Sequence, residues 1–245
     1  MDRRIALLSD ARGYVGPALA RLLAASGHDL VVGDPAPGLV DELTDAGAAV
    51  EVVEGTQDLA EPGTAERLVQ AALDRFGRID CATAFTGRIV VGRFLTSTLD
   101  DLHRALTGCV DAPYLFLRAV VPVLVEQGGG QVLVFTSAAG ARPTPGAPLY
   151  SSARAGANML VRNVAGEVAR HGVQVNALGT NFMDFPEFLR ASRAEDPEGR
   201  ARVEAQVPMG RLGTIAEFAA FCMPFVDGTS RFTTGQFVAY AGGWA

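Results

Sequence analysis

The sequence lacks any run of lysine or arginine residues that could neutralise a row of phosphates. Its formal net charge is -6 at pH 7, which favours an acidic surface typical of soluble proteins. Its three cysteines, Cys81, Cys109 and Cys222, show no CxxC spacing, and an odd number fits no closed disulfide framework. We therefore expect no nucleic-acid partner and a location in the reducing cytoplasm.

Long apolar runs are also missing from the sequence. The apolar run near the N-terminus, residues 5–8, is too short for the hydrophobic region of a signal peptide. No segment approaches the composition of a membrane span, so we expect no membrane partner. The histidines His28, His103 and His171 have no spacing typical of metal ligands, so we expect no metal.

Short apolar runs alternate with helical patterns along the whole chain, which is typical of a parallel sheet with crossover helices. With 245 residues and 49% hydrophobic content, the sequence can form one large core. We predict one Rossmann-like α/β domain over residues 1–245, a three-layer sandwich whose seven-stranded parallel sheet is flanked by helices. The predicted strands are 4–8, 29–33, 50–53, 79–84, 131–136, 173–178 and 236–240. The predicted helices are 15–26, 64–76, 99–126, 149–170 and 214–225, with a kink or break at Pro113.

Residues 179–213 do not show this alternation of apolar runs and helical patterns, and we predict that they form a long irregular segment. The segment is rich in aromatic side chains, among them Phe182, Phe185 and Phe188. Structureless loops of such length in compact domains are usually lids or binding loops. We expect 179–213 to be the region that binds substrate.

A serine, a tyrosine and an arginine stand in the spacing S-x12-Y-x3-R, as Ser137, Tyr150 and Arg154. Residues at i and i+4 share one face of a helix, so Tyr150 and Arg154 can meet. A guanidinium is always charged, and beside a tyrosine it favours the phenolate and lowers the pKa of that tyrosine. Because it cannot shuttle a proton as a lysine can, the pattern suggests a tyrosine base working without a redox cofactor.

The turn after the first strand, residues 9–16, reads SDARGYVG and is poor in glycine. With S-x12-Y, the chain resembles the short-chain dehydrogenase/reductase superfamily, whose turn T-G-x-x-x-G-x-G leaves room for a dinucleotide. In that register Asp10 and Tyr14 replace two glycines, and only Gly16 remains. Further departures on the cofactor side are at Ala84, Phe85, Cys109, Thr180 and Asn181. Asp34, after the second strand, would by itself suggest a contact to the ribose of NAD, but Gly33-Asp34-Pro35 is also typical of a turn.

The combination of S-x12-Y-x3-R with [T/S]-x4-[F/Y]-x-G, the block YSSARAGA and the C-terminal GGW resembles the halohydrin dehalogenases. These are carbon–halide lyases that work without a cofactor. The resemblance implies conversion of vicinal halohydrins to epoxides with release of halide and a proton, and the reverse opening of epoxides by small anions. In this reaction Tyr150 would be the base, Arg154 would lower its pKa, and Ser137 would orient the substrate oxygen.

The same resemblance implies a halide site and a substrate pocket. The halide site would comprise Tyr14, Gly179, Thr180, Asn181, Phe182 and Met183. The expected pocket residues are Phe85, Ala139, Thr144, Phe185 and Phe188. The ligands would be a small halohydrin or epoxide and a halide, and no cofactor is expected.

Two other functions stay open. The first is an NAD(P)-dependent short-chain oxidoreductase with an atypical turn, favoured by the fold and by Asp34. The second is a catalytically silent scaffold that binds a small ligand, although a binding module has no evident need for Ser137, Tyr150 and Arg154 together.

Small residues along the Tyr150 helix, such as Ala153, Gly156 and Ala157, permit the close approach of another helix. Members of the superfamily pair this helix and the preceding long one across subunits, so we expect a homotetramer. Trp244 either covers the pocket of a neighbouring subunit or anchors the C-terminus by packing.

Overall fold

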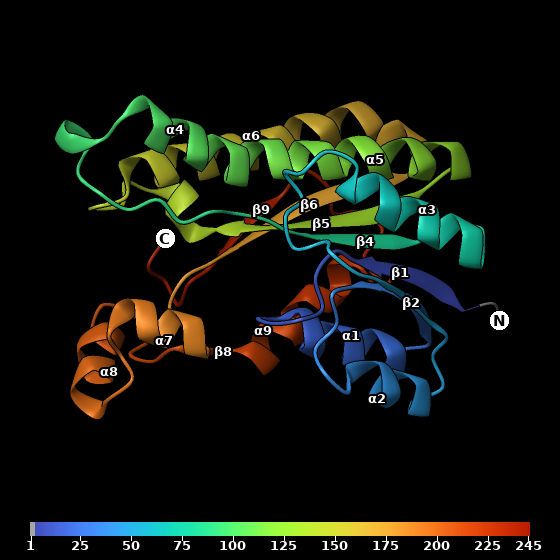
Figure 1. Cartoon of the computed structure of the whole chain (residues 1–245), viewed down its shortest axis with the longest axis horizontal. Coiled ribbons are helices and arrows are strands. Elements are labelled where there is room, and N and C mark those ends of the chain that lie inside the picture. The colour runs from blue at the N-terminus through green and yellow to red at the C-terminus, as the bar shows by residue number, and fades with distance from the viewer. Residues whose placement is uncertain (1–2) are drawn as a thin grey trace.

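A seven-stranded parallel sheet forms the centre of the computed structural model, which describes residues 3–245 (Figure 1). Its strand order is β3-β2-β1-β4-β5-β6-β9. The bounds are β1 Arg4–Leu8, β2 His28–Gly33, β3 Val50–Val53, β4 Cys81–Phe85, β5 Gly130–Ser137, β6 Val173–Thr180 and β9 Phe237–Tyr240. The predicted fold class is confirmed, and no strand end differs from the predicted one by more than two residues. The assignment of residues 1–245 to one domain stays a prediction.

Helices cover both faces of the sheet (Figure 1). The helices α1 Gly16–Ala25, α2 Leu39–Asp45 and α9 Ile215–Cys222 lie on one face, and α3 Thr64–Phe76, α4 Leu99–Leu106, α5 Ala112–Gln127 and α6 Pro148–Val168 lie on the other. Side chains alternate between the two cores, since Leu7 of β1 joins the core beneath α3 and α5, whereas Ala6 and Leu8 join the core beneath α1. This burial on both faces explains why the strands read as continuous apolar runs.

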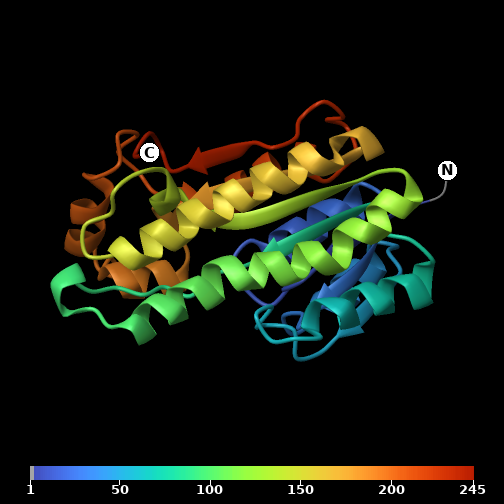
Figure 2. The ribbon, with the colours of Figure 1, turned by 90° about the horizontal axis from the view of Figure 1, so that it is seen from above.

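The helices α4 and α5 are continuous through a π-helical turn at Thr107–Asp111 (Figure 2). The prediction of a break at Pro113 is therefore wrong. The helix instead accommodates this proline, which lacks the N–H that would bond the carbonyl of Cys109, next to the π-helical turn that ends at Asp111. The combined helix Leu99–Gln127 spans 29 residues, with a mean hydropathy of 1.6 in its most apolar stretch. It is therefore long and apolar enough to cross a membrane, which the sequence analysis did not anticipate. Half of that stretch is buried within the protein, as in the core helix of a layered fold.

The segment 179–213 is folded, and in this respect the sequence analysis was wrong. It contains β7 Met183–Asp184, α7 Pro186–Ser192, α8 Pro197–Glu204 and β8 Gly213–Thr214, which form a lobe beside the carboxyl edge of the sheet (Figure 1). Its own small core consists of Phe182, Ala194, Val203, Val207 and Leu212. These helices, like α2, were missed because seven or eight residues give too few turns for a recognisable apolar period.

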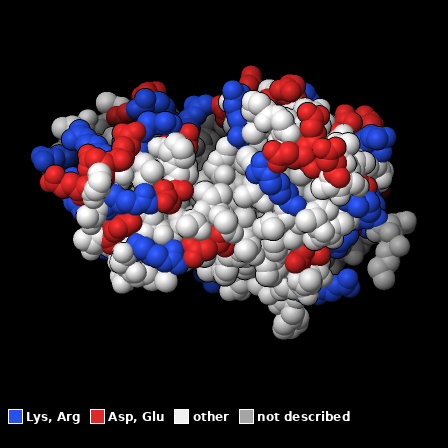
Figure 3. All heavy atoms as spheres, turned by 90° about the horizontal axis from the view of Figure 1, so that it is seen from below, with Lys and Arg blue, Asp and Glu red and all other residues white. Residues whose placement is uncertain are grey.

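The face that carries the lobe, α1 and α9 shows arginine side chains interspersed with acidic ones (Figure 3). Several of these charges are paired, for example Arg21 with Glu42 at 2.6 Å and Arg211 with Glu217 at 2.7 Å. The middle of this face carries few charges of either sign.

Candidate active site

A cavity of about 800 Å³ lies at the carboxyl edge of the sheet. It is lined by residues that follow β1, β4, β5 and β6, and by the lobe. The chain runs from β1 to β2 and β3 on one side and continues with β4 on the other, so the cavity lies where the strand order reverses. Open α/β sheets usually bind ligands at this point. Ser137, Tyr150 and Arg154, the candidate catalytic residues of the sequence, all line the cavity.

Ser137 is the last residue of β5 and is paired in register with Thr180 of β6. Its Oγ accepts a hydrogen bond from the N–H of Ala139 at 3.2 Å and donates one to the carbonyl of Thr180 at 3.4 Å. The second bond is long, so the hydroxyl proton can be redirected to a ligand at little cost. Tyr150, in the first turn of α6, is nearly buried but lines the same cavity.

Arg154 lies one turn further along α6 and is only 4% exposed. Its Nη2 donates to the carbonyl of Thr86 at 2.6 Å, and its Nη1 donates to Thr86 Oγ1 at 3.1 Å and to the Phe135 carbonyl at 3.5 Å. A side chain at position 87 would collide with the guanidinium, because a Cβ on Gly87 would come within 1.7 Å of Nη2. Thr86 and Gly87 thus hold the arginine in place. This positioning role of Thr86 and Gly87 was not predicted from the sequence. The feature that could have indicated it is the Thr-Gly pair directly after β4.

The guanidinium of Arg154 lies over the ring of Tyr150, with Cζ 5.2 Å from the ring centroid. The predicted meeting of these residues on one helix face is confirmed, and it takes the form of a cation–π contact. Within residues 3–245, no aspartate or glutamate forms an ion pair with Arg154. A buried positive charge without a carboxylate is costly, which favours a compensating negative charge in the cavity.

Tyr14 contributes the aromatic wall opposite Ser137. Its backbone is in the left-handed region, with φ of 50°, and its hydroxyl lies 2.5 Å from Thr180 Oγ1. The ring packs against Phe185 at 4.8 Å and Phe218 at 5.9 Å between centroids. Burial raises the pKa of Tyr14 well above its ordinary value, so this hydroxyl stays protonated.

Most of the other predicted site residues also line the cavity. They are Phe85, Ala139, Thr144, Thr180, Asn181, Phe182, Met183, Phe185 and Phe188. Gly179 does not line it and lies in β6 beneath Ser137, where a Cβ would come within 2.6 Å of the Ser137 backbone and of the Phe237 ring. Gly179 therefore serves close packing of the two strands. Trp244 packs within its own chain, 5.5 Å from Phe182 between ring centroids.

Comparison with known proteins agrees with this architecture. Residues 11–245 match the family model described as enoyl-(acyl carrier protein) reductase. The chain belongs to this family of the short-chain dehydrogenase/reductase superfamily. An uncharacterised oxidoreductase of Mycobacterium tuberculosis is 31% identical over 97% of this chain and 90% of its own length. The 2,5-dichloro-2,5-cyclohexadiene-1,4-diol dehydrogenase of Sphingobium indicum is 25% identical over 99% and 96%. The gluconate 5-dehydrogenase of Burkholderia cenocepacia, crystallised with NADP and tartrate, shares the fold with a TM-score of 0.87, at 24% identity over 100% and 96% of the two chains.

These relatives are oxidoreductases, so the prediction of a halohydrin dehalogenase, a cofactor-independent lyase, is wrong. The expectation of halohydrin, epoxide and halide as ligands depended on that prediction and therefore loses its support. The prediction depended strongly on Arg154 as a replacement for lysine. However, all 21 basic residues of this chain are arginine and none is lysine. An arginine at position 154 therefore reflects the composition of the whole chain, and by itself it does not distinguish one chemistry from another.

The superfamily implies a nicotinamide dinucleotide, whose pyrophosphate normally meets the N–H groups of the first turn. Here the Asp10 carboxylate accepts the N–H of Arg12 at 2.7 Å, although burial raises the pKa of Asp10 above its ordinary value. When ionised, Asp10 repels a pyrophosphate at this position, and Tyr14 stands where the superfamily has a glycine. The first turn is therefore expected to bind a pyrophosphate less tightly than the glycine-rich turn of the superfamily.

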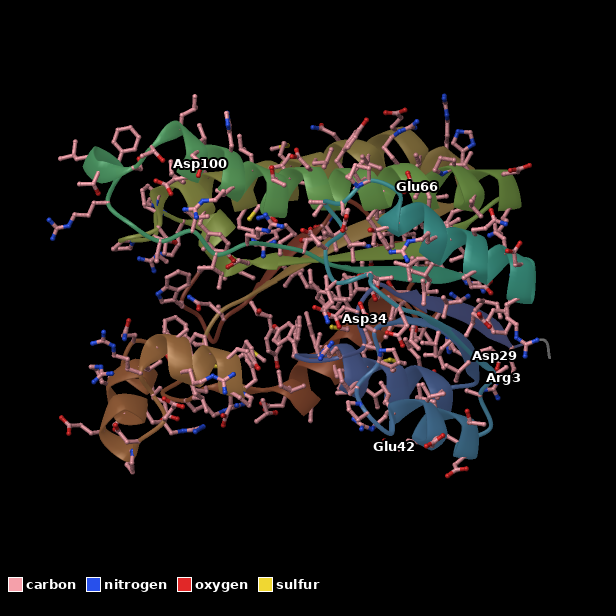
Figure 4. The ribbon with its side chains drawn as sticks, in the orientation of Figure 1. Arg3, Asp29, Asp34, Glu42, Glu66 and Asp100 are labelled. Atoms are coloured by element: carbon pink, nitrogen blue, oxygen red, sulfur yellow. The ribbon has the colours of Figure 1, made fainter. Side chains whose placement is uncertain are left out.

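Asp34 lies at the carboxyl end of β2, where a ribose would be bound (Figure 4). Its carboxylate accepts hydrogen bonds from the N–H of Gly55 at 2.8 Å and of Thr56 at 2.6 Å, and from Thr56 Oγ1 at 3.2 Å. Burial acts to raise the pKa of Asp34, but these bonds outweigh it and hold the pKa below its ordinary value. Asp34 is thus a charged carboxylate whose acceptor sites are largely used within the chain.

The described residues 3–245 hold no group of three or more histidine, cysteine, aspartate or glutamate side chains placed to bind a metal ion.

Proposed function

We propose that this protein is a short-chain oxidoreductase that interconverts a hydroxyl and a carbonyl group in a small, mostly apolar molecule. The observation that carries the proposal is the convergence of Ser137, Tyr150 and Arg154 on one cavity. Its remaining walls are largely aromatic or aliphatic, with Phe85, Ala139, Phe182, Met183, Phe185 and Phe188. Such walls favour an apolar substrate that is fixed at one polar end. The dehydrogenase and reductase names of the relatives support the reaction class.

In this proposal Tyr150 gives a proton to the substrate oxygen during reduction and takes it during oxidation. Ser137 Oγ donates to the same oxygen in place of its long bond to the Thr180 carbonyl. The Arg154 charge, 5.2 Å from the Tyr150 ring centroid, stabilises the negative charge that develops on the phenol oxygen. Thr86 and Gly87 keep this charge in place while the proton moves.

One relative is named L-rhamnose 1-dehydrogenase (NAD(P)(+)), and the gluconate 5-dehydrogenase structure contains NADP. NAD(H) and NADP(H) are therefore the first hydride acceptors and donors to test. We propose a preference for NADH over NADPH, because the charged Asp34 would repel a phosphate on the adenosine ribose. Fluorescence titration with each cofactor, followed by assays on a panel of secondary alcohols and ketones, tests both points. Absence of cofactor-dependent turnover across the panel would refute the proposed function.

Removal of the Asp10 charge is expected to strengthen NADH binding. In Asp10→Asn the repulsion between carboxylate and pyrophosphate is lost, and about 1–4 kcal/mol at contact distance corresponds to roughly fivefold or more in Kd. The wild-type protein should approach the variant as the pH falls, because Asp10 has a raised pKa and becomes protonated early. NADH titrations from neutral to acidic pH measure both effects. Asp45→Asn, on exposed α2, removes the same charge elsewhere and should leave Kd unchanged; equal effects of both variants would contradict a local role.

We propose that the chain forms a homotetramer through the face made by α4, α5 and α6, which run side by side (Figure 2). Large apolar side chains are exposed there, with Leu99 at 66%, Tyr114 at 48% and Met159 at 53%. Exposed apolar patches of this kind mark interaction surfaces. Light scattering should give about four times the chain mass of 25.6 kDa. The double variant Tyr114→Arg, Met159→Arg should lower this mass, and a monomer mass for the wild type would rule out the assembly.

We also propose that the protein works in the cytoplasm. Cys81, Cys109 and Cys222 are buried and unpaired, as is usual in a reducing compartment.

A further inference from the structure

A second cavity of about 320 Å³ lies behind the wall of the catalytic cavity. The two cavities share three consecutive wall residues, Asn181, Phe182 and Met183. The rest of the second cavity comes from the end of the lobe and from the C-terminal segment 239–243. The two spaces are thus neighbours, separated by one short stretch of chain.

Phe182 is the large ring in this dividing stretch, and it is held from several directions. It is 7% exposed, and its ring lies 6.0 Å from Phe188 and 5.5 Å from Trp244 between centroids. Its backbone is in the left-handed region, with φ of 57°, and its N–H donates to the Asn181 side chain at 3.0 Å. Trp244 is itself fixed by Arg142, which donates to its carbonyl at 2.7 Å and stacks on its ring at 4.7 Å.

The chemistry of the second cavity indicates an uncharged occupant. Val207 and Met209 contribute apolar surface, and the only charged lining residue is Arg211. Both terminal nitrogens of Arg211 donate to the Glu217 carboxylate, at 2.9 and 2.7 Å. Because this charge is already neutralised, the cavity suits an aliphatic or aryl group better than an anion.

We propose that Phe182 is a specificity-determining partition, which limits the length of the apolar substituent that a substrate can carry. With the ring in place, the substituent ends in the catalytic cavity. When the ring is shortened, the two cavities join and a longer substituent extends between Val207 and Met209. This inference rests on the proposed oxidation of alcohols at Ser137 and Tyr150.

The test compares wild type, Phe182→Leu and Phe182→Ala on a homologous series of straight-chain secondary alcohols. The quantity measured is the ratio of kcat/KM for the longest alcohol to that for the shortest. We expect this ratio to rise by at least about tenfold in Phe182→Ala and by less in Phe182→Leu, since each methylene that gains a pocket improves discrimination. Phe188→Ala is the matched control, because Phe188 contacts Phe182 but lines only the catalytic cavity. An unchanged ratio in the Phe182 variants, or an equal rise in Phe188→Ala, overturns the proposal.

A binding measurement separates this inference from the proposed function. Calorimetric titration with a long-chain methyl ketone needs no turnover, and the Phe182 variants should bind it more tightly than wild type and Phe188→Ala. If no variant oxidises any alcohol but the Phe182 variants gain ketone affinity, the proposed reaction fails and the partition stands. Phe182 belongs to the small core of the lobe, so Phe182→Ala could unfold the protein. In that case Phe182→Leu, which keeps a branched apolar side chain in the core, gives the result. Equal ketone affinity in wild type and folded Phe182→Leu overturns the partition.

Discussion

Replacement of Tyr150 by phenylalanine is expected to lower kcat by about 10²–10⁴-fold, the usual contribution of a positioned acid or base. The variant loses only the hydroxyl group, and the ring keeps its contact with the Arg154 guanidinium. Among residues 3–245 the hydroxyl has no hydrogen-bond partner, so its removal should leave the melting temperature nearly unchanged. Steady-state kinetics with a secondary alcohol and NAD, together with thermal unfolding, measure the two effects.

The control for this experiment is Tyr114→Phe, which removes the same group from an exposed tyrosine on α5. Activity of Tyr150→Phe within twofold of wild type would show that another group transfers the proton. A large loss of stability would instead mean that the hydroxyl has a structural role.

Replacement of Arg154 by methionine is expected to lower kcat by roughly 10²-fold, comparable to the loss of one electrostatic stabiliser in other active sites. Methionine keeps the length of the side chain but removes the charge over the Tyr150 ring. Arg154→Lys should retain most of the activity, because an ammonium at this position keeps the charge and can still donate to the Thr86 carbonyl. We therefore expect kcat to be highest in the wild type, lower in Arg154→Lys and lowest in Arg154→Met.

Two opposing contributions are expected to set the effect of Arg154→Met on the free energy of unfolding. The Thr86 carbonyl loses its donor, which costs about 1–3 kcal/mol for a buried group left unsatisfied, whereas the Phe135 carbonyl keeps the hydrogen bond that Thr86 Oγ1 donates at 2.8 Å. Against this, a buried charge without a carboxylate is removed, and relief of its desolvation offsets part of that cost. Thermal unfolding and kcat measured on the same samples would separate the effect on stability from the effect on catalysis. Wild-type turnover in Arg154→Met would contradict an electrostatic role.

Gly87→Ala tests the position of the arginine without changing its charge. The added Cβ would lie 1.7 Å from the present position of Nη2, and φ of 126° is also unfavourable for alanine. The guanidinium must therefore move, so kcat should fall even though every charge is retained. Gly166→Ala, on the same helix as Arg154 but with open space around it, is the matched control.

Most of the sheet was predictable because each strand is buried on both faces and therefore appears as an apolar run of fixed length. The helix that carries Tyr150 and Arg154 was predictable for a related reason, since a spacing of four residues places both on one face wherever the helix lies. The lobe could not be predicted in this way. Its helices α7 and α8 are short, and their apolar side chains pack mainly against each other and Trp244.

The chemical assignment failed where it relied on the identity of one residue. Arginine in place of lysine at position 154 does not indicate lost redox function, because all 21 lysine and arginine positions of the chain are arginine. Asp10 and Tyr14 do depart from the glycine-rich turn of the superfamily, but this departure does not exclude a dinucleotide. The sequence thus pointed correctly to an unusual turn but not to the reaction.

By itself, the sequence determined the strands, the main helices and the spacing that brings Ser137, Tyr150 and Arg154 to one cavity. These features depend on local periodicity and on the meeting of strand ends at one edge of a parallel sheet. Only the tertiary structure decided which groups hold them. Arg154 is bound by Thr86, 68 residues away, and Tyr14 meets Thr180 across 166 residues. Such contacts depend on the order of the strands and on the fold of the lobe, and a pattern along the chain does not record distances between segments that lie far apart in sequence.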